Sequence, residues 1–210
     1  MKAYHVYLIR HGMTQGNKEG KYIGRLDLPV SEQGKEEIAG MIKKYRYPYA
    51  EMFFSSPMTR CIETLKLIYP EAEPEIVKDL RECDFGDYEG KALSELKDDP
   101  DYQKWASGSI ETPPNGESSK SFQLRCCSAF EKIVEKLMRS GTSSAVIVAH
   151  GGTIMSILGT YGFPRRQMYE WMTGNAMGYE VVITPQLWIS GKAIEVAGAI
   201  PLQEDESEFI

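Results

Sequence analysis

Two histidines and two arginines, far apart in the sequence, are the residues whose types and positions could do chemistry together. Arg10 and His11 follow the apolar run "VYLI", and His150 follows another, "AVIVA". Arg60 lies just beyond "SSPMT", where a helix is expected to begin. Arginine offers a planar fork of donors that matches phosphate oxygens, and it stays charged. The set is therefore suited to holding a tetrahedral phosphate dianion.

A neutral histidine in such a set can attack phosphorus. Guanidinium charge disfavours the imidazolium form, so an imidazole beside Arg10 and Arg60 stays neutral near pH 7. Attack by its free nitrogen gives a phosphohistidine and divides one difficult displacement into two easier ones. The departing alcohol then needs a proton, which a carboxyl beside bound phosphate can supply. The stretch "LRECDFGDYEG" offers Glu82, Asp84, Asp87 and Glu89, and spacing alone does not choose between Glu82 and Asp84.

These residues are predicted to follow strands of one sheet. Because strands alternate with helices, the sheet should be mostly parallel and covered on both faces. Ligands of such sheets bind beyond the carboxyl ends of the strands, where the four residues would converge. Strands are expected over residues 4–9, 51–55, 75–78, 145–149, 178–184 and 193–196. Helices are expected over residues 31–46, over 57–68 with Ser56 as N-cap, over 118–139 and from 153 onward.

Composition limits the class of protein. A chain of 210 residues that is 42% hydrophobic can bury one substantial core. A net charge of −6 and a pI near 5.3 argue against a nucleic-acid-binding protein. No apolar run approaches the roughly 18 residues that span a bilayer, and no signal-peptide pattern is present. The four cysteines lack zinc-site spacing, so we predict a cytoplasmic protein without metal or cofactor, and leave a homodimer open.

Five segments, in this order, resemble the motifs of the histidine phosphatase superfamily, also called phosphoglycerate mutase-like. They are "RHGMTQGN", "SSPMTRCIET", "LRECDFGDYEG", "PPNGES" and "VAHGG". The resemblance implies a three-layer α/β/α sandwich with a mostly parallel central sheet. It also implies one domain over residues 1–200, with a helical or loop cap insertion at about 91–117. The acidic residues 201–210 would form a tail, and "QEDESEF" within it is predicted to be disordered.

The resemblance also implies a role for each matching residue. His11 is the phosphorylated nucleophile, and Glu82 is the proton donor. Arg10 and Arg60 hold the phosphate, and His150 donates a hydrogen bond to it. Gly12 and Gly151 let the backbone approach the phosphate oxygens. Further substrate contacts are Asn17, Thr14, Gly151 and Arg25, although Thr14 could equally bond loop backbone and Arg25 could be a surface charge.

The predicted function is hydrolysis of a small phosphorylated metabolite through a phosphohistidine. Mutase members carry extra cations around the glutamate motif, whereas residues 86–96 hold only Lys91. The region from "FGDYEG" to "PPNGES" is similar to the α-ribazole phosphatase branch, which grades into broad-specificity phosphatases. Two alternatives stay open. They are phosphoglycerate mutase-type phosphoryl transfer, and an inactive phosphate-binding module, which should have lost His11, Glu82 or His150.

Overall fold

A seven-stranded sheet positions the candidate site, and the computed structural model describes residues 2–203 of the chain. Within these residues β7 alone runs antiparallel to its neighbours β1 and β8, which confirms the prediction of a mostly parallel sheet. Side by side, the strands are β4 (Glu75–Ile76), β3 (Met52–Ser55), β5 (Ser144–Ala149), β1 (Tyr4–Arg10), β7 (Gly178–Ile183), β8 (Ile194–Ile200) and β6 (Gly162–Phe163).

The register of the two central strands brings distant residues together. β1 and β5 are parallel, and Arg10 lies opposite Ala149. His11 and His150 therefore leave the sheet at the same level, one residue beyond each strand. Both strands are buried on both faces, which explains why each reads as a continuous apolar run.

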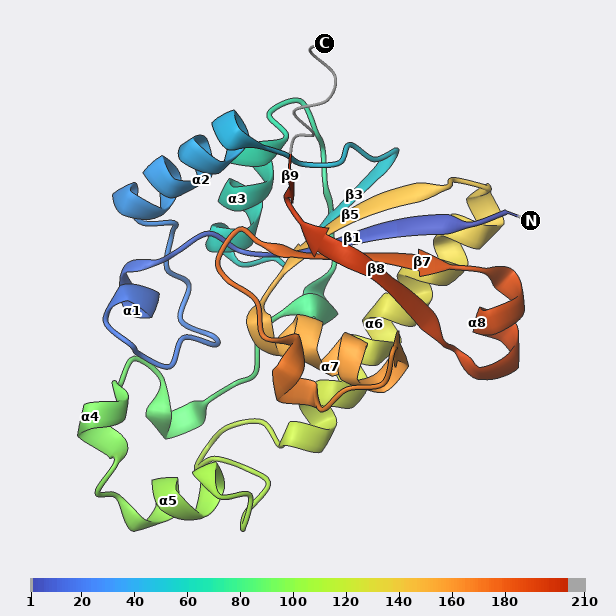
Figure 1. Cartoon of the computed structure of the whole chain (residues 1–210). Coiled ribbons are helices and arrows are strands. Elements are labelled where there is room, and N and C mark those ends of the chain that lie inside the picture. Colours follow the sequence, from blue (N-terminus) through green and yellow to red (C-terminus); the bar gives the residue numbers. More distant parts are fainter. Residues whose placement is uncertain (1, 204–210) are drawn as a thin grey trace.

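Helices cover both faces of the sheet, which gives the α/β/α sandwich (Figure 1). On one face, α6 (Ser119–Ser140) and α7 (Gly151–Tyr161) pack against alternate residues of β1 and β5 in one apolar core. On the other, α2 (Glu32–Lys44) and α3 (Thr59–Ile68) form a second core with the remaining residues of these strands. No helix in residues 2–203 is both long and apolar enough to cross a bilayer.

The ends of the helices follow local signals in some places and depart from them in others. Ser31 and Ser118 cap α2 and α6 through their hydroxyls, and Gly141 ends α6 at a φ of 72°. The prediction that Ser56 caps a helix starting at Pro57 is wrong, because α3 begins at Thr59. Strand β4 is shorter than predicted, β8 extends to Ile200, and α7 begins at Gly151 rather than at Thr153.

Residues 91–117 lie beside the sandwich and contain two short helices, α4 (Leu93–Leu96) and α5 (Pro100–Ala106) (Figure 1). We call residues 91–117 the cap. Its rings form an aromatic cluster with rings from outside it, made of Tyr22, Phe85, Tyr88, Tyr102 and Trp105. The other short elements are α1 (Gln15–Lys18), η1 (Lys78–Leu80), η2 (Gly86–Tyr88), η3 (Met168–Trp171) and α8 (Pro185–Gly191).

Part of the predicted tail is ordered. Residues 202–203 form β9 (Leu202–Gln203), which pairs with β2 (Tyr45–Arg46), at the point where the first predicted helix was expected to end. The remainder of the predicted disordered segment, residues 204–209, lies outside the described residues.

Candidate active site

His11 follows β1 directly and is buried, with 4% of its surface exposed. Its Nδ1 lies 2.7 Å from the carbonyl oxygen of Gly12. A carbonyl only accepts, so Nδ1 carries the proton and Nε2 keeps its lone pair. Burial, followed by the charge of Arg60, lowers the pKa of His11 from 6.5 to about 3. The ring is therefore neutral, with one fixed tautomer.

His150 lies beside His11, with ring centroids 5.3 Å apart and an angle of 62° between the planes. It follows β5, precedes α7, and is fully buried. Burial and then the charge of Arg60 lower its pKa well below 6.5, so this ring is neutral as well. Its Nε2 lies 2.8 Å from Oγ of Ser56. Ser56 thus fixes the second ring, a role that the sequence analysis missed because the serine matched a helix cap.

Two arginines are held by backbone carbonyls through their terminal nitrogens. Arg60 is completely buried and donates to the carbonyls of Leu26 and Gly24, both at 2.8 Å. Arg10 donates to the carbonyl of Thr173 at 2.7 Å. Within residues 2–203, Nε of each is buried and has no partner. A buried N–H without an acceptor is costly, so both arginines are prepared for an anion.

Glu82 reaches the same centre from the segment that follows η1. Its two carboxyl oxygens accept from the backbone N–H groups of Cys83 and Gly152, each at 2.9 Å. A Cβ at Gly152 would lie 2.4 Å from Oε1, so the contact requires glycine there. Burial raises the pKa of Glu82, against the lowering effect of Arg60 and Arg10. A carboxyl with a raised pKa can hold a proton for donation.

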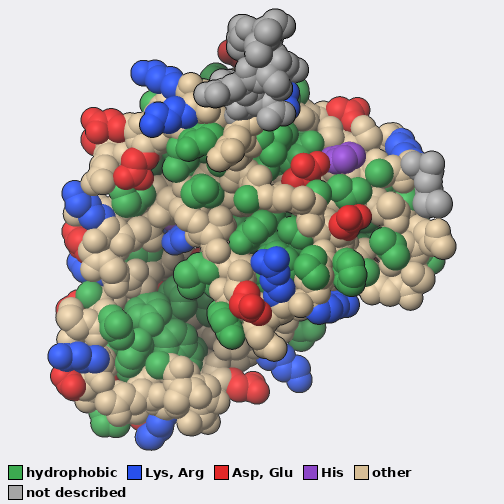
Figure 2. Space-filling view, in the orientation of Figure 1, with side chains coloured by type: hydrophobic (Ala, Val, Ile, Leu, Met, Phe, Trp, Pro, Cys, Tyr) green, Lys and Arg blue, Asp and Glu red, His purple; other side chains and the backbone are tan. Residues whose placement is uncertain are grey.

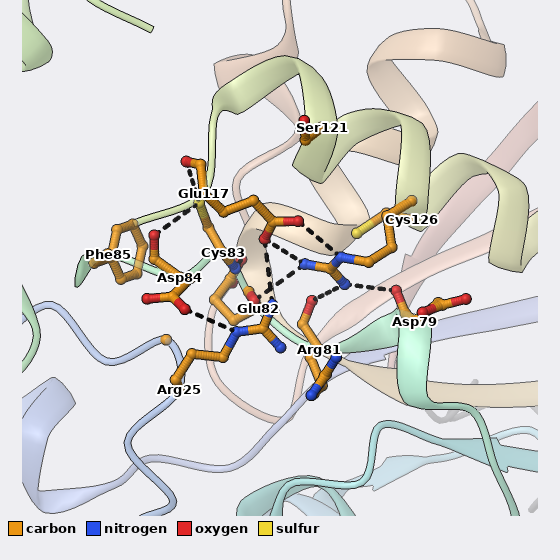
Figure 3. Close-up of polar contacts among 12 residues, drawn as sticks. Arg25, Asp79, Arg81, Glu82, Cys83, Asp84, Phe85, Glu117, Ser121 and Cys126 are labelled. Carbon is orange, nitrogen blue, oxygen red and sulfur yellow. Dashed lines mark hydrogen bonds and ion pairs between the residues drawn. The ribbon is translucent and has the colours of Figure 1, made fainter. Parts of the chain in front are cut away.

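Arg125, on α6, holds the segment that carries Glu82 (Figure 3). Its guanidinium donates to the carbonyls of Asp79, Arg81 and Glu82 at 2.8, 3.0 and 3.3 Å. The carboxylate of Glu117 accepts from it at 2.7 and 3.0 Å. One part-buried ion pair therefore holds three carbonyls of residues 79–82. The sequence analysis did not single out Arg125.

In the loop after His11, the polar side chains mostly form hydrogen bonds within the loop. Thr14 caps α1, because its hydroxyl accepts from the backbone N–H of Asn17 and donates to the Asn17 side chain. The Thr14 hydroxyl is thus hydrogen-bonded within the loop, to Asn17. Asn17 is held there through its Oδ1, and within residues 2–203 its amide NH₂ donates to no other residue. Asn175, another residue the sequence analysis missed, donates to the carbonyl of His11 at 2.9 Å.

The remaining predicted positions are Gly151, Gly12 and Arg25, and their surroundings differ. A Cβ at Gly151 would lie 3.5 Å from Nε of Arg10, so this glycine leaves room at the free donor. At Gly12 the corresponding space is filled by Ile38, which indicates packing rather than approach to a ligand. Arg25 lies near Asp84 and Glu117, beside Glu82 (Figure 3).

The surface is hollowed between the cap and the segments that carry the site residues, and hydrophobic side chains line the cap side of the hollow (Figure 2). Within residues 2–203 no group of three or more His, Cys, Asp or Glu side chains is arranged to hold a metal ion. The positive charge at the site comes from arginines. This arrangement can bind a phosphate and transfer it to an imidazole nitrogen.

Comparison with protein families and characterised sequences gives a consistent result. The family model described as histidine phosphatase superfamily (branch 1) matches residues 6–192. A 2,3-bisphosphoglycerate-dependent phosphoglycerate mutase 2 of Gloeobacter violaceus is 34% identical over 161 residues, which are 72% of each chain. The adenosylcobalamin/alpha-ribazole phosphatase of Escherichia coli is 25% identical over 172 residues, 79% of this chain and 83% of that one. Relatives thus include mutases and phosphatases.

Solved structures share the fold. The alpha-ribazole phosphatase from Shigella flexneri has a TM-score of 0.75 at 22% identity and covers 97% of this chain and 100% of its own. A phosphoglycerate mutase from Bacillus anthracis has a TM-score of 0.76 at 21% identity, with 96% and 94% covered. The predicted phosphoglycerate mutase-like sandwich is therefore confirmed.

Proposed function

Because the chain belongs to the histidine phosphatase superfamily, branch 1, we propose that it hydrolyses a small phosphomonoester through a phosphohistidine formed on His11. The observation that supports this most directly is the state of the His11 ring. The ring is buried and neutral. Its Nδ1–H donates a hydrogen bond to the Gly12 carbonyl, and its Nε2 keeps a lone pair. Arg10 and Arg60 each have a buried, unpartnered Nε among the described residues.

In the first half-reaction Nε2 of His11 attacks phosphorus, and the bond between phosphorus and the alcohol oxygen breaks. Glu82 gives its proton to the departing oxygen. Arg10 and Arg60 neutralise the charge on the other phosphate oxygens. In the second half-reaction water attacks the phosphohistidine, and Glu82 takes a proton from that water. Inorganic phosphate leaves, and His11 and Glu82 return to their starting states.

His150 stabilises the transferred phosphoryl group in this scheme. Ser56 occupies its Nε2, so Nδ1 is the nitrogen left to carry a proton toward the phosphate. The Ser56 hydroxyl must then donate to Nε2. Ser56 is accordingly a positioning residue that sets the tautomer of His150.

Phosphoglycerate mutase-type transfer is the second candidate, favoured by the 34% identity to the Gloeobacter violaceus mutase. Both activities share the first half-reaction and differ in whether water or a second hydroxyl accepts the phosphate. Hydrolysis is the first choice because residues 86–96 hold a single cation, Lys91. An inactive phosphate-binding module is the weakest candidate, since His11, Glu82 and His150 are all present.

Hydrolysis of p-nitrophenyl phosphate in EDTA tests the proposal. We expect His11→Ala to abolish turnover and His5→Ala, which alters a part-exposed histidine at the start of β1, to preserve it. Rapid quenching should trap a phosphoenzyme that is stable in base and labile in acid. Undiminished turnover by His11→Ala would refute the nucleophile.

Two further assays choose the reaction and the substrate. Bisphosphoglycerate-stimulated interconversion of phosphoglycerates that exceeds hydrolysis severalfold would favour the mutase. Values of kcat/KM for α-ribazole phosphate, sugar phosphates and phosphoglycerates would then rank the candidate substrates.

A further inference from the structure

Two arginines flank the proposed proton donor without belonging to the phosphate site. Arg81 directly precedes Glu82. Arg25 directly follows Gly24, whose carbonyl accepts from Arg60 at 2.8 Å. Each is therefore one residue away, on a different segment, from a group at the reaction centre. Figure 3 shows both side chains on the same side of the Glu82 segment.

Arg25 is poorly matched by its acidic neighbours. Its Nε is 3.7 Å from Asp84 and its Nη2 is 3.4 Å from Glu117, both longer than a good charge-assisted hydrogen bond. Glu117 is already held by Arg125 at 2.7 Å, and Asp84 accepts from the backbone of Gly86 at 3.0 Å. Nη1 of Arg25 is buried and has no partner in the described part of the chain.

The Arg81 side chain has no ion-pair or hydrogen-bond partner within residues 2–203. Its Nε is buried without an acceptor. Burial, followed by the charges of Arg25 and Arg125, lowers the pKa of Arg81. The carboxylates of Asp79 and Glu117 oppose this lowering without cancelling it, and neither one forms an ion pair with Arg81 in the described residues. Arg10 and Arg60 show the same signature, a buried donor without an acceptor, at the phosphate.

We propose that Arg25 and Arg81 bind a second anionic group, a carboxylate or a phosphate, on the leaving group of the substrate. The inference rests on the proposed function, because Glu82 must reach the oxygen that links leaving group and phosphorus. The leaving group therefore lies on the Glu82 side of the phosphate, where these two arginines are. The substrate class is a phosphomonoester with a second anion on its alcohol portion.

This class differs from α-ribazole phosphate, whose leaving group carries no second anion. It also weakens the distinction drawn from Lys91, because cations near the glutamate motif serve a mutase and a phosphatase alike. The fate of the phosphoryl group, and not this subsite, separates those two activities.

A matched pair of substrates tests the subsite. 3-Phosphoglycerate and glycerol 3-phosphate differ by a carboxylate in place of a hydroxymethyl group, and both have alkyl leaving groups that need the acid. The measured quantity is the ratio of their kcat/KM values, with turnover counted as loss of the starting phosphomonoester. We expect Arg81→Gln and Arg25→Gln each to lower this ratio about 10- to 100-fold, mainly through KM for the acid. Arg139→Gln, an exposed change on α6, should leave it unchanged.

The outcomes separate the two proposals. A ratio that both glutamine variants leave unchanged, or that only one lowers, overturns the subsite even if His11-dependent hydrolysis of p-nitrophenyl phosphate persists. Loss of His11 dependence overturns the proposed function instead. Arg81→Lys keeps the charge and should retain part of the preference. If Arg81→Gln does not fold, Arg81→Lys takes its place, and a smaller fall in the ratio is expected.

Discussion

At the scale of single residues, the proposed reaction depends on two groups, His11 and Glu82, whose pKa values burial shifts in opposite directions. A histidine with the ordinary pKa of 6.5 would be charged in mild acid, whereas His11 has a pKa of about 3. A glutamate with the ordinary pKa of 4.5 would have lost its proton there, whereas burial raises the pKa of Glu82. The lowered pKa of His11 and the raised pKa of Glu82 thus widen, from both sides, the pH range in which His11 is neutral while Glu82 holds a proton.

The pH profile of kcat/KM for an alkyl phosphate should follow from these directions. On the acid side, activity falls only as His11 gains a proton near its lowered pKa. On the alkaline side, activity falls as Glu82 loses its proton, above the ordinary 4.5. Glu82→Gln should remove the alkaline limb and lower the rate by about 10²- to 10⁴-fold.

Asp84→Asn is the matched control, since spacing alone left Asp84 as a rival acid. The control should keep the alkaline limb. If Asp84→Asn removes that limb and Glu82→Gln keeps it, the acid has been misassigned.

Ser56→Ala should lower kcat through His150 rather than through folding. The change removes a buried hydrogen bond of 2.8 Å that fixes the ring. A loss of about 0.5–1.5 kcal/mol corresponds to a fall in kcat of about two- to tenfold, with KM less affected. Ser156→Ala is the control, because its hydroxyl is equally buried but has no partner among residues 2–203. Equal effects of the two changes on kcat would mean that Ser56 has no special role.

At the scale of elements, the parallel register of β1 and β5 creates the site, and only part of it could be predicted. The apolar runs and the residues that end them predict two strands and a shared edge. Strand order is not present in the sequence pattern, so the meeting of His11 and His150 was an expectation. The outcome for Ser56 shows why. The local sequence around Ser56 favours a helix cap, but in the structure its hydroxyl contacts the ring of His150, which is 94 residues away.

Arg125 on α6 is a second residue whose contacts the sequence pattern does not predict. The apolar spacing of α6 predicts its buried face, yet says nothing about what a polar residue on that helix will meet. The partners of Arg125 are carbonyls of residues 79–82, which only the tertiary fold brings near. Sites made of side chain and backbone from separate elements are therefore the part that sequence patterns miss.

Arg125→Lys should lower both stability and catalysis by loosening the segment that carries Glu82. Lysine keeps the charge but cannot serve three carbonyls and a carboxylate together. We expect a loss of about 1.5–3 kcal/mol in unfolding free energy, as for lost hydrogen bonds to a charged group at a part-buried position. The fall in kcat should be larger for an alkyl phosphate than for p-nitrophenyl phosphate, whose leaving group needs no acid. Arg139→Lys on the same helix is the control. Equal losses with both substrates would indicate general damage instead.

At the scale of the whole molecule, residues 22–24 lie between the aromatic cluster of the cap and Arg60. Tyr22 shares a hydroxyl–hydroxyl contact of 2.7 Å with Tyr102, and its ring lies 5.1 Å from Phe85 and 5.6 Å from Trp105. Its backbone also pairs with that of residues 90 and 91. Two residues later, Gly24 contacts Arg60 of the phosphate site. Residues 22–24 therefore contact both the cap cluster and Arg60.

Tyr22→Ala should release the cap while leaving the sheet intact. Removing a large ring from a packed cluster costs about 3–5 kcal/mol, all of which is lost locally if the cap opens on its own. Amide hydrogen exchange over residues 100–106 should then accelerate by at least about 100-fold, with β1 and β5 unchanged. Tyr49→Ala, which removes a ring that is 72% exposed, should alter neither region. Acceleration spread equally over cap and sheet would mean that they unfold as one unit. In that case the cap would not open independently of the sheet.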